Sequence, residues 1–406
     1  MAARPALIKL ASVTLTALIA AAVLAPGAVA APGQASPAGT LQAWGDDLNG
    51  QLGNGATGKV DVPVSVLLPA GVTVTAVAAG GKHTLALTSA GQVLAWGDNH
   101  DGQLGDGLTG DSHVPVQVKL PEGTVVTAIA TGAVDCMAVT SAGQVYAWGN
   151  NQYGQLGDGS TVTRRTPVRV LLPRGVKAVA VAASYNYSLA LTSTGEVYTW
   201  GYNGSGQLGN GFLTSSEVPG RVHLPRGVVI REVTSGGYDG LALSAKGQLY
   251  AWGDNRYGQL GDGTRKSRVS PVLVKLPKGV KITAIAGGSQ HSLALTSAGQ
   301  VLAWGLGSFG QLGTGSTKNS DVPVAVHLPA KDVISRISAG GGFSLAITSA
   351  GQELAWGHNA FGQLGNGTMT SKDVPVLVHL PSGLSVVALA AGPTTRHTLA
   401  IVIPST

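Results

Sequence analysis

"LAWGDNHDGQLGDG" (94–107) decides the fold, because the chain repeats it almost letter for letter. It returns as "YAWGNNQYGQLGDG" from 146, "YAWGDNRYGQLGDG" from 250 and "LAWGHNAFGQLGNG" from 354. The seven tryptophans are 52 residues apart, and "GQLG" keeps the same step in seven units. The tryptophans are Trp44, Trp96, Trp148, Trp200, Trp252, Trp304 and Trp356. A fixed period of this length indicates repeated supersecondary units that must stack to bury their apolar faces.

One unit reads as four short strands. The stretches 74–80, 83–89 and 92–97 are alternating or continuously apolar, and 62–69 opens with a proline, as an edge strand can. Gly91 stands in the tight turn between two of them, where a hairpin needs a positive φ. No stretch after residue 38 shows sustained helical periodicity. The sequence therefore predicts an all-β fold.

Four strands per unit, repeated radially, predict a seven-bladed β-propeller with four-stranded antiparallel blades. The alternative is an open β-solenoid, which needs atypical polar caps at its ends. The ends favour the ring: "TLQAWG" (40–45) is the second half of a hairpin, and "HTLAIV" (397–402) is a first half. We expect these terminal strands to pair and close the ring. The tryptophans should then lie between blades, with Leu104 and its equivalents turned inward.

Residues 1–30 have the pattern of a Sec-type signal peptide. Arg4 and Lys9 precede an apolar stretch that ends in Ala28-Val29-Ala30, so we expect cleavage after Ala30. A membrane anchor is the alternative, but Pro26 and Gly27 interrupt the stretch. The predicted organisation is a signal peptide (1–30), a short linker (31–38) and the propeller (39–403). We expect a secreted, extracellular monomer without membrane insertion.

Composition limits the class of partner. Charged residues are 11% of the chain, one Cys excludes an internal disulfide framework, and loss of Arg4 and Lys9 lowers the net charge from +6 to +4. This mild basicity does not argue for nucleic acid. Two basic clusters, 164–177 and 265–281, are expected on the outer rim or connecting loops. They are either plain solvated charge or a surface for an anionic cell-wall polymer. No motif for a cofactor is present.

Two short windows vary between units while their surroundings do not. In a closed ring, the first window would circle the central channel on one face. It comprises Lys82-His83, Val134-Asp135, Asn186-Tyr187, Tyr238-Asp239, Gln290-His291, Gly342-Phe343 and Arg396-His397. The second comprises Leu48-Asn49, His100-Asp101, Gln152-Tyr153, Gly204-Ser205, Arg256-Tyr257, Ser308-Phe309 and Ala360-Phe361.

The second window places an aromatic residue at one register in four units. These residues, Tyr153, Tyr257, Phe309 and Phe361, are the predicted contact residues. Arg256, Tyr185, Tyr187 and Tyr238 are supporting candidates. Exposed aromatics near an arginine are typical of protein-binding hot spots and of sugar-stacking platforms. The alternative is that these rings pack on neighbouring loops.

Catalytic and metal sites are not predicted. His83, His397 and Asp135 would be neighbours in a closed ring and are acceptable metal ligands, but a structural hydrogen bond explains such histidines more simply. Asp135 and Asp239 could act as acid and base only if their carboxyl groups were about 5–10 Å apart. Cys136 would need a histidine and a cation or helix terminus to activate it, and His83 is the one candidate histidine. We expect no enzyme activity.

The pattern "GxxHTLALTSAGQVLAWGDNxxGQLGDG", with "VPVxVxLPxG" between copies, resembles the regulator of chromosome condensation repeat family over residues 39–403. The resemblance implies a seven-bladed propeller. It also implies guanine-nucleotide exchange on a small nuclear GTPase and chromatin binding. The family's exchange factor uses an inserted wedge, whereas units of 52 residues leave no room for one before a two-residue addition near Pro393. We carry over no catalytic residue.

Similar repeats occur in secreted bacterial proteins that bind other proteins, including propeller inhibitors of β-lactamase. We therefore expect a secreted bacterial binding propeller that contacts an unknown extracellular protein through one loop face. Binding of carbohydrate or cell wall is the first alternative. An exchange-factor activity is the second.

Overall fold

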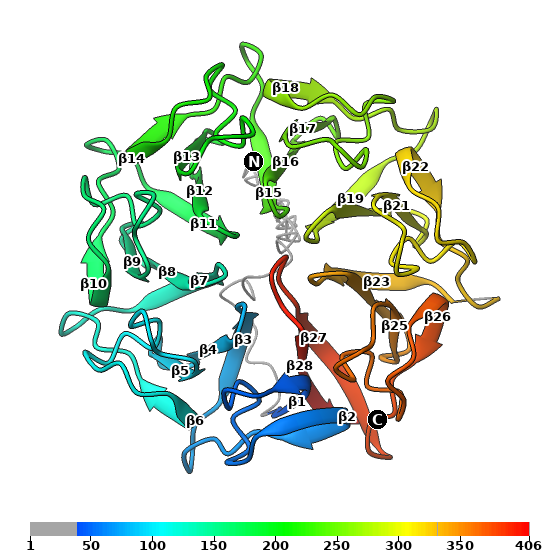
Figure 1. The fold of residues 1–406 in the computed structure, drawn as a ribbon, viewed down its shortest axis with the longest axis horizontal. Helices are drawn as coiled ribbons and strands as arrows, with labels where there is room; N and C mark the ends of the chain where they lie inside the picture. The colour runs from blue at the N-terminus through cyan, green and yellow to red at the C-terminus, as the bar shows by residue number, and fades with distance from the viewer. Residues whose placement is uncertain (1–38, 331, 406) are drawn as a thin grey trace, which may run out of the picture.

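The computed structural model describes residues 39–330 and 332–405, and within them the chain forms seven four-stranded sheets arranged as a ring (Figure 1). The predicted all-β, seven-bladed propeller with antiparallel blades is confirmed. The predicted signal peptide (1–30) and linker (31–38) lie outside the described residues. No helix in the described part of the chain could cross a membrane.

Six blades run from an innermost strand to an outermost strand in chain order, and we number them along the chain. Blade 1 holds β3 (Val74–Ala79), β4 (His83–Thr88), β5 (Val93–Gly97) and β6 (Ser112–Gln117); blade 2 holds β7 (Val126–Thr131), β8 (Asp135–Thr140), β9 (Val145–Gly149) and β10 (Arg164–Arg169); blade 3 holds β11 (Ala178–Ala183), β12 (Tyr187–Thr192), β13 (Val197–Gly201) and β14 (Ser216–Arg221). Blade 4 holds β15 (Ile230–Ser235), β16 (Asp239–Ser244), β17 (Leu249–Gly253) and β18 (Arg268–Leu273); blade 5 holds β19 (Ile282–Gly287), β20 (His291–Thr296), β21 (Val301–Gly305) and β22 (Ser320–Ala325); blade 6 holds β23 (Ile334–Ala339), β24 (Phe343–Thr348), β25 (Glu353–Gly357) and β26 (Lys372–Leu377).

The closing blade joins both ends of the chain, in the order β27 (Leu384–Ala390), β28 (His397–Pro404), β1 (Thr40–Asp47) and β2 (Gly58–Ser65). β1 and β28 are antiparallel, and Trp44 lies opposite Thr398. Trp96 lies opposite Thr84 in the same way in blade 1. The predicted closure by the terminal strands is therefore confirmed, and the closing pair has the register of an ordinary hairpin. Figure 1 shows the blue and red strands side by side in this blade.

The core lies between blades. The clusters of buried hydrophobic side chains each combine residues of two adjacent sheets. One cluster contains Leu85 of blade 1 with Val126 and Trp148 of blade 2. All seven tryptophans are fully buried. Each indole Nε1–H donates to the main-chain carbonyl of the "GQLG" glutamine in the preceding blade, as from Trp148 to Gln103 at 2.9 Å. The predicted inter-blade position of the tryptophans is confirmed.

The close approach of the tryptophan ring also requires the glycine that ends "GQLG". Gly105 has φ +64°, and a Cβ at this position would lie 2.9 Å from Nε1 of Trp148. Leu104 beside it is fully buried, as predicted. Its N–H donates to Oδ1 of the buried Asn99 at 2.9 Å. The repeated phrase therefore builds the joint between blades, which leaves function to the residues that vary.

Candidate functional site

The two variable windows lie on one face of the ring. The first window comprises the end of the loop between the first and second strands of each blade and the first residue of the second strand, and the second window lies in the loop between the third and fourth strands. Main-chain hydrogen bonds link these loops, as between the Asp98 N–H and the Lys82 carbonyl at 2.9 Å. We call this surface the loop face.

The second residue of each first-window pair is buried, contrary to the expectation that both would surround the channel. These residues are His83, Asp135, Tyr187, Asp239, His291, Phe343 and His397, all at most 1% exposed. They begin the second strand of each blade and point into the packing between blades. The first residues of the pairs remain near the channel mouth, where Lys82 and Arg396 are exposed.

Tyr187 cannot be a contact residue and is a correction to the predicted set. Its ring is 0% exposed, and its hydroxyl donates to the carbonyl of Asp239 in the next blade. Burial raises the pKa of Tyr187 well above its ordinary value. This position varies between units, but the variation reflects alternative ways to fill the space between blades.

The histidines of this ring link blades. Nε2 of His83 lies 3.1 Å from Sγ of Cys136, and Nε2 of His397 lies 3.0 Å from Oγ1 of Thr84. Burial lowers the pKa of His83 to about 4 and that of His397 to about 3, so both are neutral at pH 7. The ring brings the two histidines into adjacent blades, but each contacts the next blade and they do not share a ligand position with Asp135.

Among the described residues, the ligand atoms of Asp98, His100 and Asp111 lie within 4.8 Å of one another. Hydrogen bonds within the loops account for this cluster. Nδ1 of His100 contacts Asp98, and the Asp111 carboxylate accepts from the Asn99 N–H and the Asn49 amide.

The carboxyl groups and the thiol that were considered as catalytic candidates are buried. Asp135 and Asp239 are fully buried, and burial raises the pKa of each carboxyl well above its ordinary value. Neither can meet a substrate as an acid–base pair. Cys136 is also fully buried, and burial raises the pKa of its thiol, so His83 beside it does not generate a thiolate.

Four tyrosines form a continuous group over blades 2 to 4. Tyr153 meets Tyr202 edge to face at 5.1 Å between ring centroids, Tyr202 meets Tyr238 at 6.0 Å, and Tyr238 stacks on Tyr185 at 5.0 Å. Tyr153 is 36% exposed. Tyr202 was not predicted. It follows "TWG", where the other units have mostly Asp or Asn, and that deviation was the available signal.

A second aromatic group covers blades 5 and 6 and reaches the closing blade. His358 lies between Phe309 and Phe361, with centroid distances of 4.7 and 6.0 Å. Lys59 and Arg396 place their cationic groups over the Phe361 ring at 4.7 and 4.8 Å. Phe309 is 45% exposed. The predicted aromatics thus do pack on neighbouring loops, yet keep exposed surface.

Of the remaining predicted residues, Arg256 is exposed and Tyr257 is half-buried in the β17–β18 loop. Arg256 pairs with Asp254 at 3.0 Å and borders the tyrosine group. Tyr257 takes no part in the aromatic contacts found among the described residues. The structure therefore separates the predicted set into a tyrosine side and a phenylalanine side.

A hollow of about 420 Å³ lies at the channel mouth between the two aromatic groups. Tyr185 and Phe309 contribute to its walls, with Lys82 and Arg396 from the first window. The loop face therefore combines a concave centre with aromatic sides. This is the arrangement in which a binding propeller can hold a partner.

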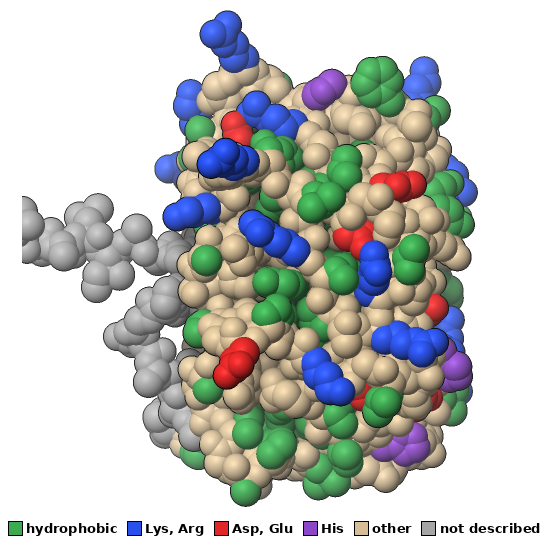
Figure 2. All heavy atoms as spheres, turned by 90° about the vertical axis from the view of Figure 1, so that its left-hand side faces the viewer, with side chains coloured by type: hydrophobic (Ala, Val, Ile, Leu, Met, Phe, Trp, Pro, Cys, Tyr) green, Lys and Arg blue, Asp and Glu red, His purple; other side chains and the backbone are tan. Residues whose placement is uncertain are grey.

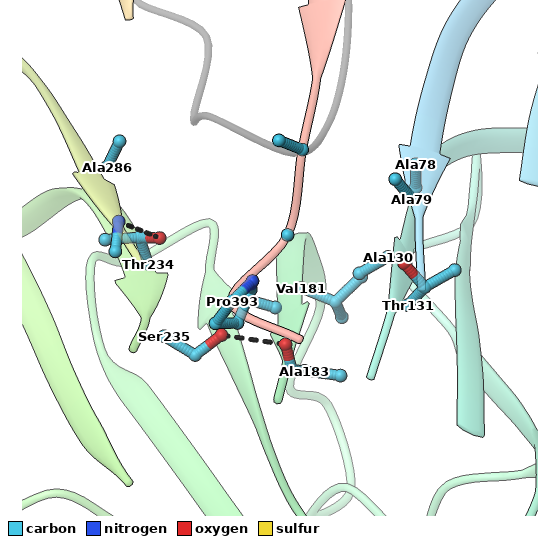
Figure 3. A pocket seen from close by; sticks show the side chains of 14 residues that line it. Ala78, Ala79, Ala130, Thr131, Val181, Ala183, Thr234, Ser235, Ala286 and Pro393 are labelled. Atoms are coloured by element: carbon cyan, nitrogen blue, oxygen red, sulfur yellow. Dashed lines mark hydrogen bonds between the residues drawn. The ribbon is translucent and has the colours of Figure 1, made fainter. Parts of the chain in front are cut away.

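A small pocket lies among the ends of the innermost strands. Its volume is about 30 Å³, which suits about two water molecules. The β27–β28 loop, which contains the two-residue addition, reaches into it. Figure 3 shows Pro393 of this loop among the inner strand ends, beside Ser235, Thr234 and Val181. This pocket is therefore too small for a ligand much larger than water.

The basic clusters lie on the outer rim, as expected, since β10 and β18 are the outermost strands of their blades. Some of their charge is neutralised locally: Arg164 pairs with Asp158 at 2.8 Å and Arg268 with Asp262 at 2.6 Å. Figure 2 shows Lys and Arg scattered over the side of the ring, with Asp, Glu and hydrophobic side chains among them.

Similarity to known proteins identifies the family to which this fold belongs. The RCC1-like domain model matches residues 40–400. The chain is 35% identical over 326 residues to the ultraviolet-B receptor UVR8 of Arabidopsis thaliana, covering 80% of this chain and 74% of that protein. It is 34% identical over 357 residues to the human E3 ubiquitin-protein ligase HERC2, covering 86% of this chain but only 7% of that protein.

Two solved structures have the same fold. Human WBSCR16 superposes with a TM-score of 0.80 at 26% identity, covering 90% of this chain and all of that one. Prp20p of Saccharomyces cerevisiae superposes with a TM-score of 0.81 at 24% identity, covering 91% and 93%. The predicted repeat family is confirmed: this chain belongs to the RCC1-like domain family.

Proposed function

We propose that the protein is a secreted, non-enzymatic binding propeller that holds another protein on its loop face. One observation carries the proposal. The side chains that every unit repeats are buried in the packing between blades. The exposed aromatic side chains occur in only some units, and they lie on one face. Tyr153 and Phe309 keep 36% and 45% of their surface exposed.

The composition of this face supports a protein partner. Aromatic side chains and arginine dominate binding hot spots, because they bury large areas at low conformational cost. Here Phe309, His358 and Phe361 form one ridge with Arg396 at its end. The aromatic contacts hold the rings in place before a partner arrives, which reduces the entropy lost on binding.

The absence of catalysis is proposed from burial. The acids and the thiol that the sequence offered for chemistry, Asp135, Asp239 and Cys136, have no exposed surface. Secretion is proposed from the sequence of residues 1–30 alone.

The test is affinity capture from culture medium and envelope fractions with the mature chain. In the test variant, Tyr153, Tyr257, Phe309 and Phe361 are all replaced by Ser. The matched control replaces four half-exposed leucines of the outer strands and their ends, Leu67, Leu171, Leu273 and Leu377, by Ser.

We expect the same protein to be retained by the original chain and the leucine control, and its affinity to fall by about tenfold or more in the aromatic variant. Circular dichroism is used to check that both variants are folded. Equal retention by the aromatic variant would show that the loop face is not the binding surface.

A further inference from the structure

A second hollow lies on the loop face over the tyrosine group. Its volume is about 670 Å³, within the range of small-ligand sites. Tyr153, Tyr202 and Tyr238 form its aromatic walls, and Asn186, Asp254 and Arg256 supply polar groups. It draws on loops of blades 2, 3 and 4, so the ring brings together residues that are far apart in the sequence.

The rings of this hollow are held in position by one another. Tyr202 makes edge contacts with Tyr153 at 5.1 Å and with Tyr238 at 6.0 Å. Tyr185 stacks behind Tyr238, and its own hydroxyl is 3.0 Å from Oγ of Ser289. These walls therefore present preorganised aromatic surface and do not depend on a ligand to assemble them.

Blade 3 differs from the other blades at two positions that build the wall. Tyr202 stands where the other units have Asp, Asn, Leu or His, and Gly204 stands where they have larger side chains. A Cβ at Gly204 would overlap the Tyr202 ring. Gly204 has no left-handed φ, so conformation does not require glycine here. The glycine makes room for the ring, and the two changes act as one feature.

The polar groups of the hollow are largely uncommitted. Among the described residues, the hydroxyls of Tyr153, Tyr202 and Tyr238 and the side-chain amide of Asn186 make no hydrogen bond to another protein group. Together these groups offer both donors and acceptors. Arg256 and Asp254 form an ion pair at 3.0 Å, which leaves the hollow without a free charge.

We propose that this hollow binds a neutral saccharide. A pyranose ring offers apolar C–H faces for the tyrosine walls and a rim of hydroxyls for the free amide, the phenols and the Asp254–Arg256 pair. An apolar ligand would leave these polar groups covered and unpaired, which is unfavourable. A charged ligand would have to compete with the existing ion pair. The proposal concerns a site beyond protein docking and does not depend on which protein the face holds.

The test measures binding of three neutral probes, cellotriose, maltotriose and chitotriose, and of the anionic trigalacturonic acid. Saturation-transfer NMR detects contact and calorimetry gives the affinity, with the mature chain throughout. The test variant is Tyr202→Asn, which installs the residue that Asn150 provides at the same place in another unit and should therefore fold. The matched control is Phe309→Ser with Phe361→Ser, in the other aromatic group.

We expect at least one neutral trisaccharide to bind the original chain and the phenylalanine control alike, and to bind Tyr202→Asn about tenfold more weakly. Gly204→Ser should weaken it as well, because the new side chain displaces the Tyr202 ring. Binding of none of the neutral probes, equal binding to Tyr202→Asn, or binding of the anionic probe alone would overturn the proposal. Protein capture by the loop face is measured separately, so failure here leaves that function standing.

Discussion

Glu232 provides a sharp test of how the blades are joined, because it places a carboxyl group where most units have a methyl group. Five of the six equivalent positions are alanine, and the sixth is Arg336. Glu232 lies in β15 and is 1% exposed. Its Oε1 accepts from the N–H of Ile285 in the next blade at 3.0 Å, whereas Oε2 has no partner in the described residues.

Burial raises the pKa of Glu232 from its ordinary 4.5 to about 8. The carboxyl is therefore neutral in the folded chain at pH 7 and ionised in the unfolded chain. Because the pKa is raised in the folded state, the contribution of Glu232 to the free energy of unfolding is fully present below pH 4.5. It declines as the pH rises towards 8. At 1.36 kcal/mol per pKa unit, the loss reaches about 3 kcal/mol at pH 7.

Glu232→Gln keeps an acceptor for Ile285 but cannot ionise. The free energy of unfolding of this variant, minus that of the original chain, should be close to constant below pH 4.5 and should increase by about 3 kcal/mol by pH 7. Urea unfolding at a series of pH values measures the difference. Other buried ionisable groups are common to both chains and cancel.

Glu122→Gln is the matched control, because Glu122 is exposed in a turn and its variant should show no such rise. A Glu232→Gln difference that stays the same from pH 4.5 to pH 8 would refute the reasoning.

Three further predictions concern single positions. Gly105→Ala should lower the free energy of unfolding by about 2–4 kcal/mol in urea titrations, because it combines strain at positive φ with a clash against Trp148; Gly175→Ala, also at positive φ but in open space, should lower it by only about 1 kcal/mol. Glu353→Val should raise the unfolding free energy at pH 7 by about 1–3 kcal/mol, since this buried carboxyl has no hydrogen-bond partner in the described residues and replaces the valine or leucine of other units; an unchanged urea midpoint would contradict this. Cys136 should resist iodoacetamide in the native chain and react after unfolding, and mass spectrometry that finds rapid native labelling would show that the blade joint opens.

The repeat explains why so much of the fold could be predicted. The chain has a tryptophan every 52 residues and an unpaired half-hairpin at each end. A closed ring buries the apolar face of every unit, and the pairing of Trp44 with Thr398 follows from this closure. The three inner strands of a blade were also predictable, because Gly91 and its equivalents mark the turns. The edge strand expected at 62–69 is instead β2 (Gly58–Ser65), which pairs with β1 in the closing blade.

The side-chain environment was less predictable, because variation between units has two physical causes. At Tyr187, it reflects different ways to fill the space between blades, and the ring is buried. At Tyr153, it reflects exposure on a loop. Sequence spacing does not distinguish these cases, since adjacent residues of one window point in opposite directions at the start of a strand. Contacts such as Tyr202 with Tyr238 also depend on the distance between blades, which one sequence does not provide.

The most direct test of the ring is the stability of a chain that ends at Arg396 and so lacks β28. In the closed propeller, this strand pairs with both β1 and β27 and completes the packing around Trp44. We predict that the shortened chain unfolds with a thermal midpoint well below that of the original chain at equal concentration. An unchanged midpoint would contradict closure by the terminal strands, and with it the single loop face on which binding is proposed.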